Sequence, residues 1–221
     1  WSIATSDVDG DGKPDMLVAN SSSNTASVLI NNGDGTYATK VDYTTGTTPQ
    51  SITSSDVNGD GKPDMLVANN SSSTISVFIN TSSTTLSFAS KVDYTTGASP
   101  YTITTSDVNG DGKLDMLVTN RLSVSASVFL NNGDGTFVAR VNYTTGTNPW
   151  SIATSDVDGD GKPDMLVANF NSSTASIFLN TSTSTLSSTP GNTQVTTTYT
   201  TPPDTDITSV LILRSTSAIT D

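Results

Sequence analysis

A nine-residue acidic loop occurs four times along this chain of 221 residues, at nearly constant spacing. The copies begin at Asp7, Asp56, Asp107 and Asp156, so successive starts are 49, 51 and 49 residues apart. Residues 1–20 recur letter for letter as residues 150–169. Self-similarity at a fixed period of about 50 residues is typical of architectures in which each unit packs only on its neighbours. The fold must therefore be assembled from copies of one small unit.

The residue pattern of each repeat predicts four short strands. In the first repeat these are Ser2–Ser6, Met16–Ala19, Ala26–Ile30 and Tyr37–Tyr43. The run Met16–Ala19 is apolar throughout, too short for a helix and suited to a strand that is buried on both faces. The segment Asn31–Thr36 reads Asn-Asn-Gly-Asp-Gly-Thr, which favours a hairpin turn. Four antiparallel strands in about 50 residues is the size of one propeller blade. We predict an all-β chain of four antiparallel blade-type repeats, propeller-like and either incomplete or closed by another chain.

The repeat boundaries divide the chain into 1–49, 50–100, 101–149 and 150–180, followed by a Ser- and Thr-rich linker at 181–192. Residues 193–221 form a β segment that resembles the start of an immunoglobulin-like or fibronectin type III module, with strands at Thr193–Thr201 and Ile207–Leu213. The fourth repeat stops at Asn180, so we expect its blade to lack an outer strand. Such an edge must be covered, and a strand donated by another copy is one way. A four-bladed ring, an open stack and part of a longer propeller all remain open.

The composition excludes several functions. The chain has no His and no Cys, and its 21 acidic residues, all Asp, outweigh 9 Lys and Arg to give a formal charge of −12. This charge argues against nucleic acid as a partner, because phosphate binding needs clustered Lys and Arg. No apolar run approaches the roughly 18 residues that a membrane span requires. Without His, a nucleophilic triad lacks its usual base, and we expect no enzymatic activity.

The acidic loop predicts a calcium site. In the first copy carboxylates stand at loop positions one, three, five and nine, and the glycines at positions four and six let the backbone curl. Calcium takes six to eight hard oxygen ligands, which alternate residues of a tight loop and one main-chain carbonyl at position seven can supply. The candidate ligands, at positions one, three, five, seven and nine, are Asp7, Asp9, Asp11, Lys13 and Asp15; Asp56, Asn58, Asp60, Lys62 and Asp64; Asp107, Asn109, Asp111, Lys113 and Asp115; and Asp156, Asp158, Asp160, Lys162 and Asp164. We expect about four Ca²⁺ ions, one per repeat, bound more tightly by the first and fourth loops, which carry an extra carboxylate.

The charge balance supports this interpretation. Fourteen of the 21 aspartates lie in the four loops, where empty sites would hold like charges within a few ångströms. Four divalent ions add eight charges and change the formal net charge from −12 to −4. Zinc is disfavoured without Cys or His, and magnesium prefers to keep its own waters. Asp/Gly turns without metal are the alternative, and four copies with the same ligand positions argue against it.

The motif resembles the FG-GAP/VCBS repeat, the calcium-loop blade of integrin α-subunit heads and of many bacterial extracellular proteins. The resemblance rests on residues 2–20 with their acidic loop, on Asn-Asn-Gly-Asp-Gly-Thr followed by Tyr or Phe, and on Gly-x-x-Pro before each new strand, and it covers about residues 1–180. It implies a β-propeller with calcium in the first hairpin of each blade. Carried over by position, the ligands of the first blade are Asp7, Asp9, Asp11 and Asp15. Propellers of this family usually close with seven blades, whereas four repeats are visible here.

Two further patterns bear on surface chemistry. Seven Asn-x-Ser/Thr sequons are candidate glycosylation sites in exposed turns: Asn20, Asn69, Asn70, Asn80, Asn142, Asn171 and Asn180. Trp1, Gln50, Tyr101 and Trp150 occupy the same repeat position. An aromatic face that stacks on a ligand is one interpretation, and we favour packing where blades meet.

We hypothesise an extracellular, calcium-stabilised structural repeat protein, a subunit of a prokaryotic surface fibre, sheath or adhesive appendage. Near-identical repeats, an incomplete last blade and a Ser/Thr-rich linker motivate it. Self-association is the expected partnership, by strand donation or otherwise. The alternatives are a glycan- or protein-binding adhesion propeller and a non-catalytic domain of a secreted polysaccharide-degrading enzyme.

Overall fold

The computed structural model describes residues 2–181 and 207–214 of the chain, which form strands, turns and bends without a helix. Sixteen strands make four antiparallel sheets of four, each in sequence order: β1 Ser2–Ser6, β2 Asp15–Asn20, β3 Thr25–Leu29 and β4 Val41–Thr44; β5 Pro49–Ser55, β6 Asp64–Asn69, β7 Thr74–Phe78 and β8 Val92–Thr95; β9 Pro100–Ser106, β10 Asp115–Asn120, β11 Ser125–Phe129 and β12 Val141–Thr144; β13 Pro149–Ser155, β14 Asp164–Asn169, β15 Thr174–Asn180 and β16 Ile207–Arg214. The all-β, four-repeat architecture predicted from the sequence is confirmed. We number the sheets as blades 1 to 4.

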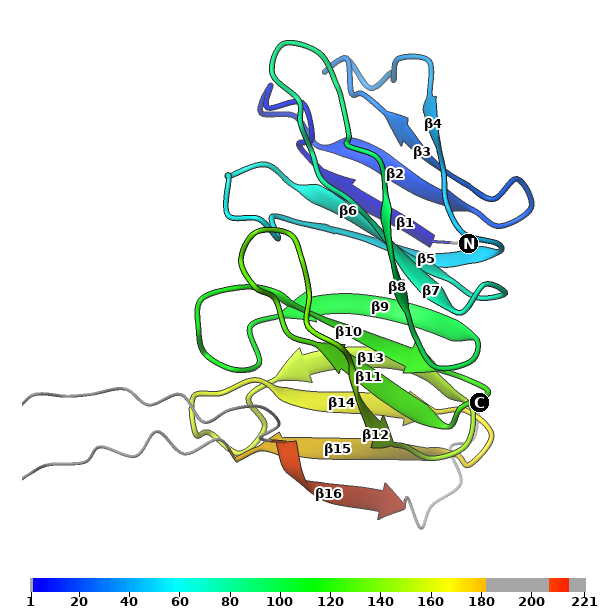
Figure 1. The fold of residues 1–221 in the computed structure, drawn as a ribbon, viewed down its shortest axis with the longest axis vertical. Coiled ribbons are helices and arrows are strands. Elements are labelled where there is room, and N and C mark those ends of the chain that lie inside the picture. Colours follow the sequence, from blue (N-terminus) through cyan, green and yellow to red (C-terminus); the bar gives the residue numbers. More distant parts are fainter. Residues whose placement is uncertain (1, 182–206, 215–221) are drawn as a thin grey trace, which may run out of the picture.

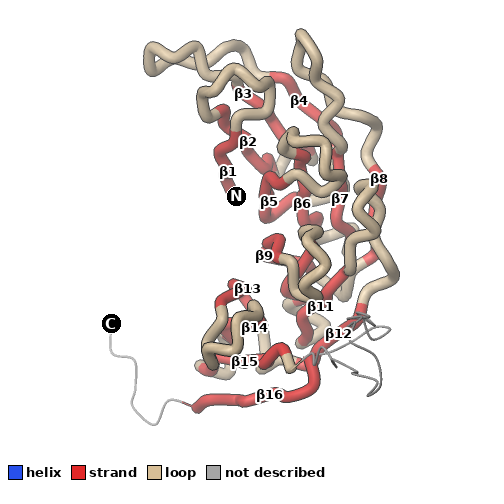
Figure 2. Tube along the Cα trace, turned by 90° about the vertical axis from the view of Figure 1, so that its left-hand side faces the viewer, coloured by secondary structure: helices blue, strands red, loops and turns tan. Residues whose placement is uncertain are grey.

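The blades follow one another along the long axis of the molecule (Figure 1). Figure 2 shows β1, β5 and β9 on one side of the stack and β4, β8 and β12 on the other, while in blade 4 the strands follow one another downward from β13 to β16, so the blades form an open arc. Within the part of the chain that the structure describes, blade 1 and blade 4 each have one neighbour. The arrangement is that of an incomplete propeller-like repeat.

The middle strands of blades 2 and 3 are buried on both faces, whereas in β2, the strand for which the sequence predicted this, Leu17 and Ala19 are buried and Met16 and Val18 are half-buried. Every residue of β6 and of β10 is buried. These strands lie at the centre of their sheets and each sheet is covered on both sides by a neighbouring blade, so both faces of the pleat meet apolar surface. A run such as Met-Leu-Val-Ala, with no polar alternation, fits that environment.

Three apolar clusters form the core, and each lies between two consecutive blades. The buried residues are Val8, Leu17, Ala19, Ala26 and Val28 with Ile52, Met65, Val67 and Phe78 between blades 1 and 2; Val57, Leu66, Ala68, Ile75 and Val77 with Ile103, Met116, Val118, Phe129 and Phe137 between blades 2 and 3; and Val108, Leu117, Ala126 and Val128 with Ile152, Met165, Val167 and Phe178 between blades 3 and 4. The three interfaces are thus copies of one another. At each interface a Tyr from the outer strand of the preceding blade packs edge-on against a buried Phe ring of the next blade, as Tyr43 does with Phe78 at 6.0 Å between ring centroids.

The fourth predicted strand of the first repeat is shorter than expected. We predicted Tyr37–Tyr43, and β4 begins only at Val41, while Tyr37 makes an isolated bridge with Asn31. The register pairs Val28 with Val41, so the residues between them leave the sheet. Their hairpin closes on itself, with Ala38 N donating to Ile30 O at 2.8 Å. The alternation of Val41 and Tyr43 holds, whereas the residues just before it serve the hairpin.

The outer position of blade 4 is occupied by β16 of the same chain. This strand pairs antiparallel with β15, with Phe178 opposite Val210. The edge that the sequence left open to a strand from another copy is therefore covered by Ile207–Arg214 in this structure. The expected strand Thr193–Thr201 and most of the linker lie outside the described residues, and the immunoglobulin-like module stays a prediction.

Candidate metal centre

Each acidic loop connects the first two strands of a blade, as Asp7–Asp15 does between β1 and β2. The loop curls because its two glycines take the left-handed conformation, with φ of 82° at Gly10 and 84° at Gly12, where an L side chain would be strained. Its carboxylates accept backbone N–H groups of the loop. Asp7 accepts from Gly10 N at 2.8 Å through one oxygen and from Gly12 N at 2.8 Å through the other. The turn is thus held around its own first aspartate.

The aspartate at position nine is fully buried in all four loops. We call these residues, Asp15, Asp64, Asp115 and Asp164, the anchor aspartates. Asp15 accepts from Val8 N at 2.9 Å with one oxygen and from Asn31 N at 2.9 Å with the other. Asp64, Asp115 and Asp164 repeat both bonds at 2.7–3.0 Å. Each anchor aspartate therefore ties the acidic loop to the chain just beyond the third strand of its blade.

The structure brings three of the four predicted carboxylates of loop one together. Oxygens of Asp7, Asp9 and Asp15 lie within 4.8 Å of one another, and Asp156, Asp158 and Asp164 do the same in loop four. In loops two and three, position three holds Asn58 and Asn109, whose amide oxygens accept from Asp60 N at 3.1 Å and Asp111 N at 3.0 Å, as Asp9 accepts from Asp11 N at 3.1 Å. Three of the five predicted ligand positions, namely one, three and nine, thus lie together in loops one and four.

The aspartate at position five faces a different neighbour. Asp11 accepts from the Lys13 ammonium at 2.6 Å, and in the other loops the corresponding Lys–Asp pairs are 3.1 to 3.8 Å apart. The sequence assigned position seven only a main-chain carbonyl directed at the metal. In the structure the side chain is half exposed and its ammonium pairs with position five, because this is the cation within reach of the loop.

The pKa values show the electrostatic state of these loops without a cation. Burial raises the pKa of Asp9 and Asp64, and it raises the pKa of Asp115 to about 6. The pKa of Asp11 is lowered by its hydrogen bond from Lys13, and that of Asp156 by the backbone N–H of Gly161. A raised pKa at a buried carboxylate means that its negative charge is poorly compensated. A divalent cation would supply the compensation.

The structure also reveals a role for the asparagine sixteen residues after each anchor aspartate, which the sequence did not suggest. We call Asn31, Asn80, Asn131 and Asn180 the bridging asparagines. The side-chain amides of the last three donate across the interface to the carbonyl of the valine in the preceding blade's loop: Val8 at 2.8 Å, Val57 at 2.9 Å and Val108 at 2.6 Å. Asn80, Asn131 and Asn180 thus each link the anchor aspartate of their own blade to the acidic loop of the blade before it. The only sequence sign was the constant spacing from the anchor.

Replacing Asn131 by Ala is expected to lower the free energy of unfolding by about 2–3 kcal/mol, because two buried carbonyls, Val57 O and Leu114 O, lose their donor. Asn31→Ala is the matched control, since Asn31 lies in blade 1 and donates to Pro14 O of its own loop. We expect the control to cost less than about 1 kcal/mol. Urea unfolding of both variants measures the difference, and equal losses would contradict the bridging role.

The sequons are not all in exposed turns, contrary to the prediction. Asn69, Asn80 and Asn180 are buried, and their side-chain amides donate hydrogen bonds in the interior. These positions close strands or bridge blades, so a glycan on them would displace core contacts. Asn142 and Asn171 are exposed, and glycosylation there remains a prediction.

The aromatic position of the repeat collects a cluster between blades 3 and 4. The guanidinium of Arg121 lies 4.8 Å from the ring centroids of both Tyr101 and Trp150, and those two rings are 4.6 Å apart. Phe170 extends the stack at 5.1 Å from Trp150. The rings pack on one another across the blades, as we favoured, while Trp150 and Phe170 keep 38% and 65% of their surface exposed. Trp1 lies outside the described residues.

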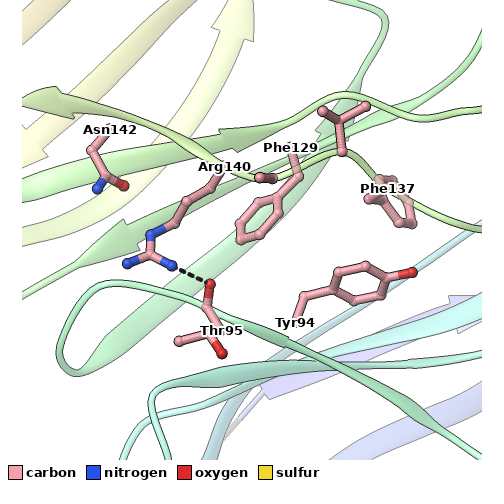
Figure 3. A pocket seen from close by; sticks show the side chains of 8 residues that line it. Tyr94, Thr95, Phe129, Phe137, Arg140 and Asn142 are labelled. Carbon is pink, nitrogen blue, oxygen red and sulfur yellow. Dashed lines mark hydrogen bonds between the residues drawn. The ribbon is translucent and has the colours of Figure 1, made fainter.

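A hollow of about 370 Å³ lies where the outer strands of blades 2 and 3 meet (Figure 3). Tyr94, Phe129 and Phe137 form its apolar wall, and Arg140 closes one end by donating to Thr95 O at 2.7 Å. Its lining offers no carboxylate, imidazole or thiol. Among the described residues, no helix is long and apolar enough to cross a membrane.

Comparison with known proteins gives matches of two kinds. A family model of FG-GAP-like repeats matches residues 7–67, 56–118 and 107–167. Similar solved structures include a functionally unknown protein from Desulfotomaculum acetoxidans (19% identity, TM-score 0.59, 80% of this chain and 53% of that one). They also include BBS1N in complex with ARL6DN (16%, 0.57, 79% and 52%) and the V. cholerae biofilm matrix protein Bap1 (17%, 0.52, 80% and 26%). The chain thus spans about half or less of the length of these structures. At such low sequence identity the similarity shows the fold alone. A search of curated protein sequences found no match.

Proposed function

The chain belongs to the family of FG-GAP-like repeat proteins, and from this premise we propose that it is a calcium-stabilised extracellular structural protein, a subunit of a surface fibre, sheath or adhesive appendage. The observation that carries the proposal is the way the first three acidic loops are built into blade interfaces. The anchor aspartates are fully buried, and Asn80, Asn131 and Asn180 connect those of blades 2 to 4 to the loop of the preceding blade. A cation in each of the first three loops would therefore stiffen the junction between two blades.

The donor set fits calcium. The loops offer carboxylate, side-chain amide and main-chain oxygens, which are the ligands that Ca²⁺ takes. Asp7, Asp9 and Asp15 would hold the ion in loop one, with Asp11 joining once its oxygen leaves the Lys13 ammonium, and the corresponding residues would do so in the other loops. Calcium would supply positive charge to carboxylates whose pKa is raised by burial, and it would bring no catalytic chemistry.

The arrangement of the blades also supports a structural role. Sixteen strands in a row of repeats give a rigid rod-like arc whose core consists of identical junctions. Such a stack is stabilised mainly by contacts between neighbouring units and can be lengthened without redesign. One similar structure is named a biofilm matrix protein, which is the kind of extracellular setting proposed here.

Electron microscopy of the purified chain in millimolar calcium tests the proposal. We expect extended assemblies in calcium that disperse when EDTA is added, because the junctions lose the cations that stiffen them. Discrete single particles at all protein concentrations would overturn the structural function. Assemblies that persist unchanged in EDTA would overturn the role of calcium.

A second candidate function is glycan or protein binding, and the cluster around Trp150 favours it. Exposed aromatic rings next to a cation provide a surface on which a sugar ring or a planar side chain can stack. Tryptophan fluorescence during titration with a panel of polysaccharides tests this function, with Trp150→Ala as the control. A response that Trp150→Ala retains would locate binding elsewhere.

A further inference from the structure

The three internal junctions are formed by two unlike faces of a blade. The back face presents the loop valine and the alternating residues of the middle strands, which in blade 1 are Val8, Leu17, Ala19, Ala26 and Val28. The front face presents the other set, which in blade 2 is Ile52, Met65, Val67 and Phe78. At every junction the back face of one blade covers the front face of the next. The two faces are therefore complementary within this chain.

Within residues 2–181 and 207–214, no blade covers the front face of blade 1 or the back face of blade 4. Ile3 is 58% exposed, whereas its counterparts Ile52, Ile103 and Ile152 are 4–6% exposed. At the other end of the stack Val157 is 46% exposed, whereas Val8, Val57 and Val108 are 1–7% exposed. The isoleucine is buried wherever a blade precedes and the valine wherever a blade follows, so the apolar surface at the two ends belongs to an interface that is used three times inside the molecule.

The remaining apolar positions of the two end faces behave in the same way. Met16 and Val18 are partly exposed, whereas their counterparts in the later blades are buried, with only 0–1% of their surface exposed. Ala168 and Ala175 of blade 4 are exposed, whereas Ala68 and Ile75 of blade 2 are fully buried. An apolar sheet face of this kind is costly in water unless it is covered.

The polar groups that pair across the internal junctions also have unmatched equivalents at the two ends of the described stack, the donors at one end and the acceptors at the other. Asn31 holds the bridging position of blade 1, the first blade that the structure describes. The carbonyl equivalent to the one that Asn180 reaches, Val108 O, is Val157 O in blade 4. Within the chain Ile103 N donates to Ser51 Oγ at 3.3 Å across a junction. The corresponding donor and acceptor at the ends are the N–H of Ile3 and the hydroxyl of the exposed Ser151.

A close approach in the hairpins completes the match. A side chain at Gly135 of blade 3 would meet Ile79 of blade 2 at 2.5 Å, so the hairpin lies directly on the preceding blade. Gly35, its counterpart in blade 1, has open space around it. Leu179 is the blade 4 residue equivalent to Ile79, and it is partly exposed. The hairpin of one end is thus shaped to lie on the other end.

We propose that a second copy of this chain docks head to tail, with the back face of blade 4 of one molecule on the front face of blade 1 of the next. The occupant is another copy because each uncovered apolar and polar group has its partner at the opposite end of the same chain. Contact between two like faces would leave Asn31 and Val157 O without those partners. A contact between unlike faces closes a ring or continues as a filament. The inference rests on the self-association proposed above and names its surface.

A cysteine pair tests the contact, because the chain has no cysteine of its own. Across the junction of blades 2 and 3 the hydroxyls of Ser55 and Thr105 are 2.7 Å apart. The equivalent pair between two molecules is Ser155 of one and Thr5 of the next. The double variant Thr5→Cys/Ser155→Cys, oxidised with glutathione disulfide in millimolar calcium, is expected to give a disulfide-linked ladder or a closed dimer on non-reducing gels.

Two controls fix the interpretation. The variant Ser55→Cys/Thr105→Cys is expected to form its disulfide within one molecule, which shows that this geometry accepts the bond. A mixture of Thr5→Cys and Ser155→Cys single variants is expected to give dimers and nothing longer, because each molecule then has one reactive end. Dimers from either single variant alone would mean contact between like faces and would overturn the proposal.

Sedimentation velocity gives an independent measurement. Ile3→Asp places a charge in the proposed contact and is expected to weaken association at least about tenfold. Leu122→Asp is the matched control, since Leu122 is 74% exposed in a turn after β10, away from both end faces, and we expect no change. Equal effects would overturn the proposal. Fibres that form without the Thr5–Ser155 disulfide would refute this docking surface and leave the structural function standing. Disulfide-linked closed dimers without fibres would support this docking surface and refute the structural function.

Discussion

Removal of calcium with excess EDTA is expected to lower the melting temperature of the chain by about 20 °C or more. A ligand that binds only the folded state stabilises it by about 2.7 kcal/mol per site at a hundredfold excess over its dissociation constant. Four such sites contribute about 11 kcal/mol, and for a domain of this size each kcal/mol shifts the melting temperature by about 2–4 °C. The effect is large because four sites add up and the first three of them lie at blade junctions. Differential scanning calorimetry at fixed protein concentration measures it.

The control for this experiment is EDTA with calcium in excess over the chelator, which should restore the original melting temperature. Magnesium in place of calcium should restore little, because it keeps its waters and demands a tighter octahedral site. A melting temperature that is the same with and without EDTA would mean that the loops are Asp/Gly turns and that no cation belongs in them.

Asp64→Ala is expected to destabilise the chain by about 3 kcal/mol even in EDTA, with a larger loss in calcium. Without its carboxylate the backbone N–H groups of Val57 and Asn80 lose their acceptor in the interior. Each unpaired buried donor costs about 1–3 kcal/mol, and relief of the desolvated charge, whose pKa is raised by burial, offsets part of this cost. Calcium adds to the loss because the variant binds the ion more weakly. Urea unfolding with and without calcium measures both parts.

Asp60→Ala separates the two roles. Asp60 is an exposed candidate ligand of the same loop and accepts from Lys62 N at 3.0 Å. In EDTA its replacement should change the free energy of unfolding by no more than about 0.5 kcal/mol, while in calcium it should cost binding energy. If Asp64→Ala and Asp60→Ala behave alike in EDTA, the anchor aspartates do not hold the acidic loops to their blades.

Most of the fold could be predicted because its determinants are local. The strands β1, β2 and β3 fall within one residue of the segments expected from alternation and from apolar runs, and the loop glycines take the positive φ that a tight acidic loop requires. The predicted convergence of positions one, three and nine is also local, because the loop curls around Asp7. Position five was harder, since its pairing with Lys13 depends on which cation lies nearby when no metal is present.

The sequence by itself determined the repeat period, the all-β class and the oxygen-rich loops, because each is written in residues that lie within one blade. Only the tertiary structure decided how the blades meet. Asn80 reaches Val8 O across 72 positions of the chain, and nothing in its own neighbourhood distinguishes it from a sequon in a turn. The pairing of β16 with β15 and the exposure of Ile3 and Val157 are likewise set by which sheet lies against which. The acidic loops are therefore predictable as sites, while their place at the junctions between blades follows from packing alone.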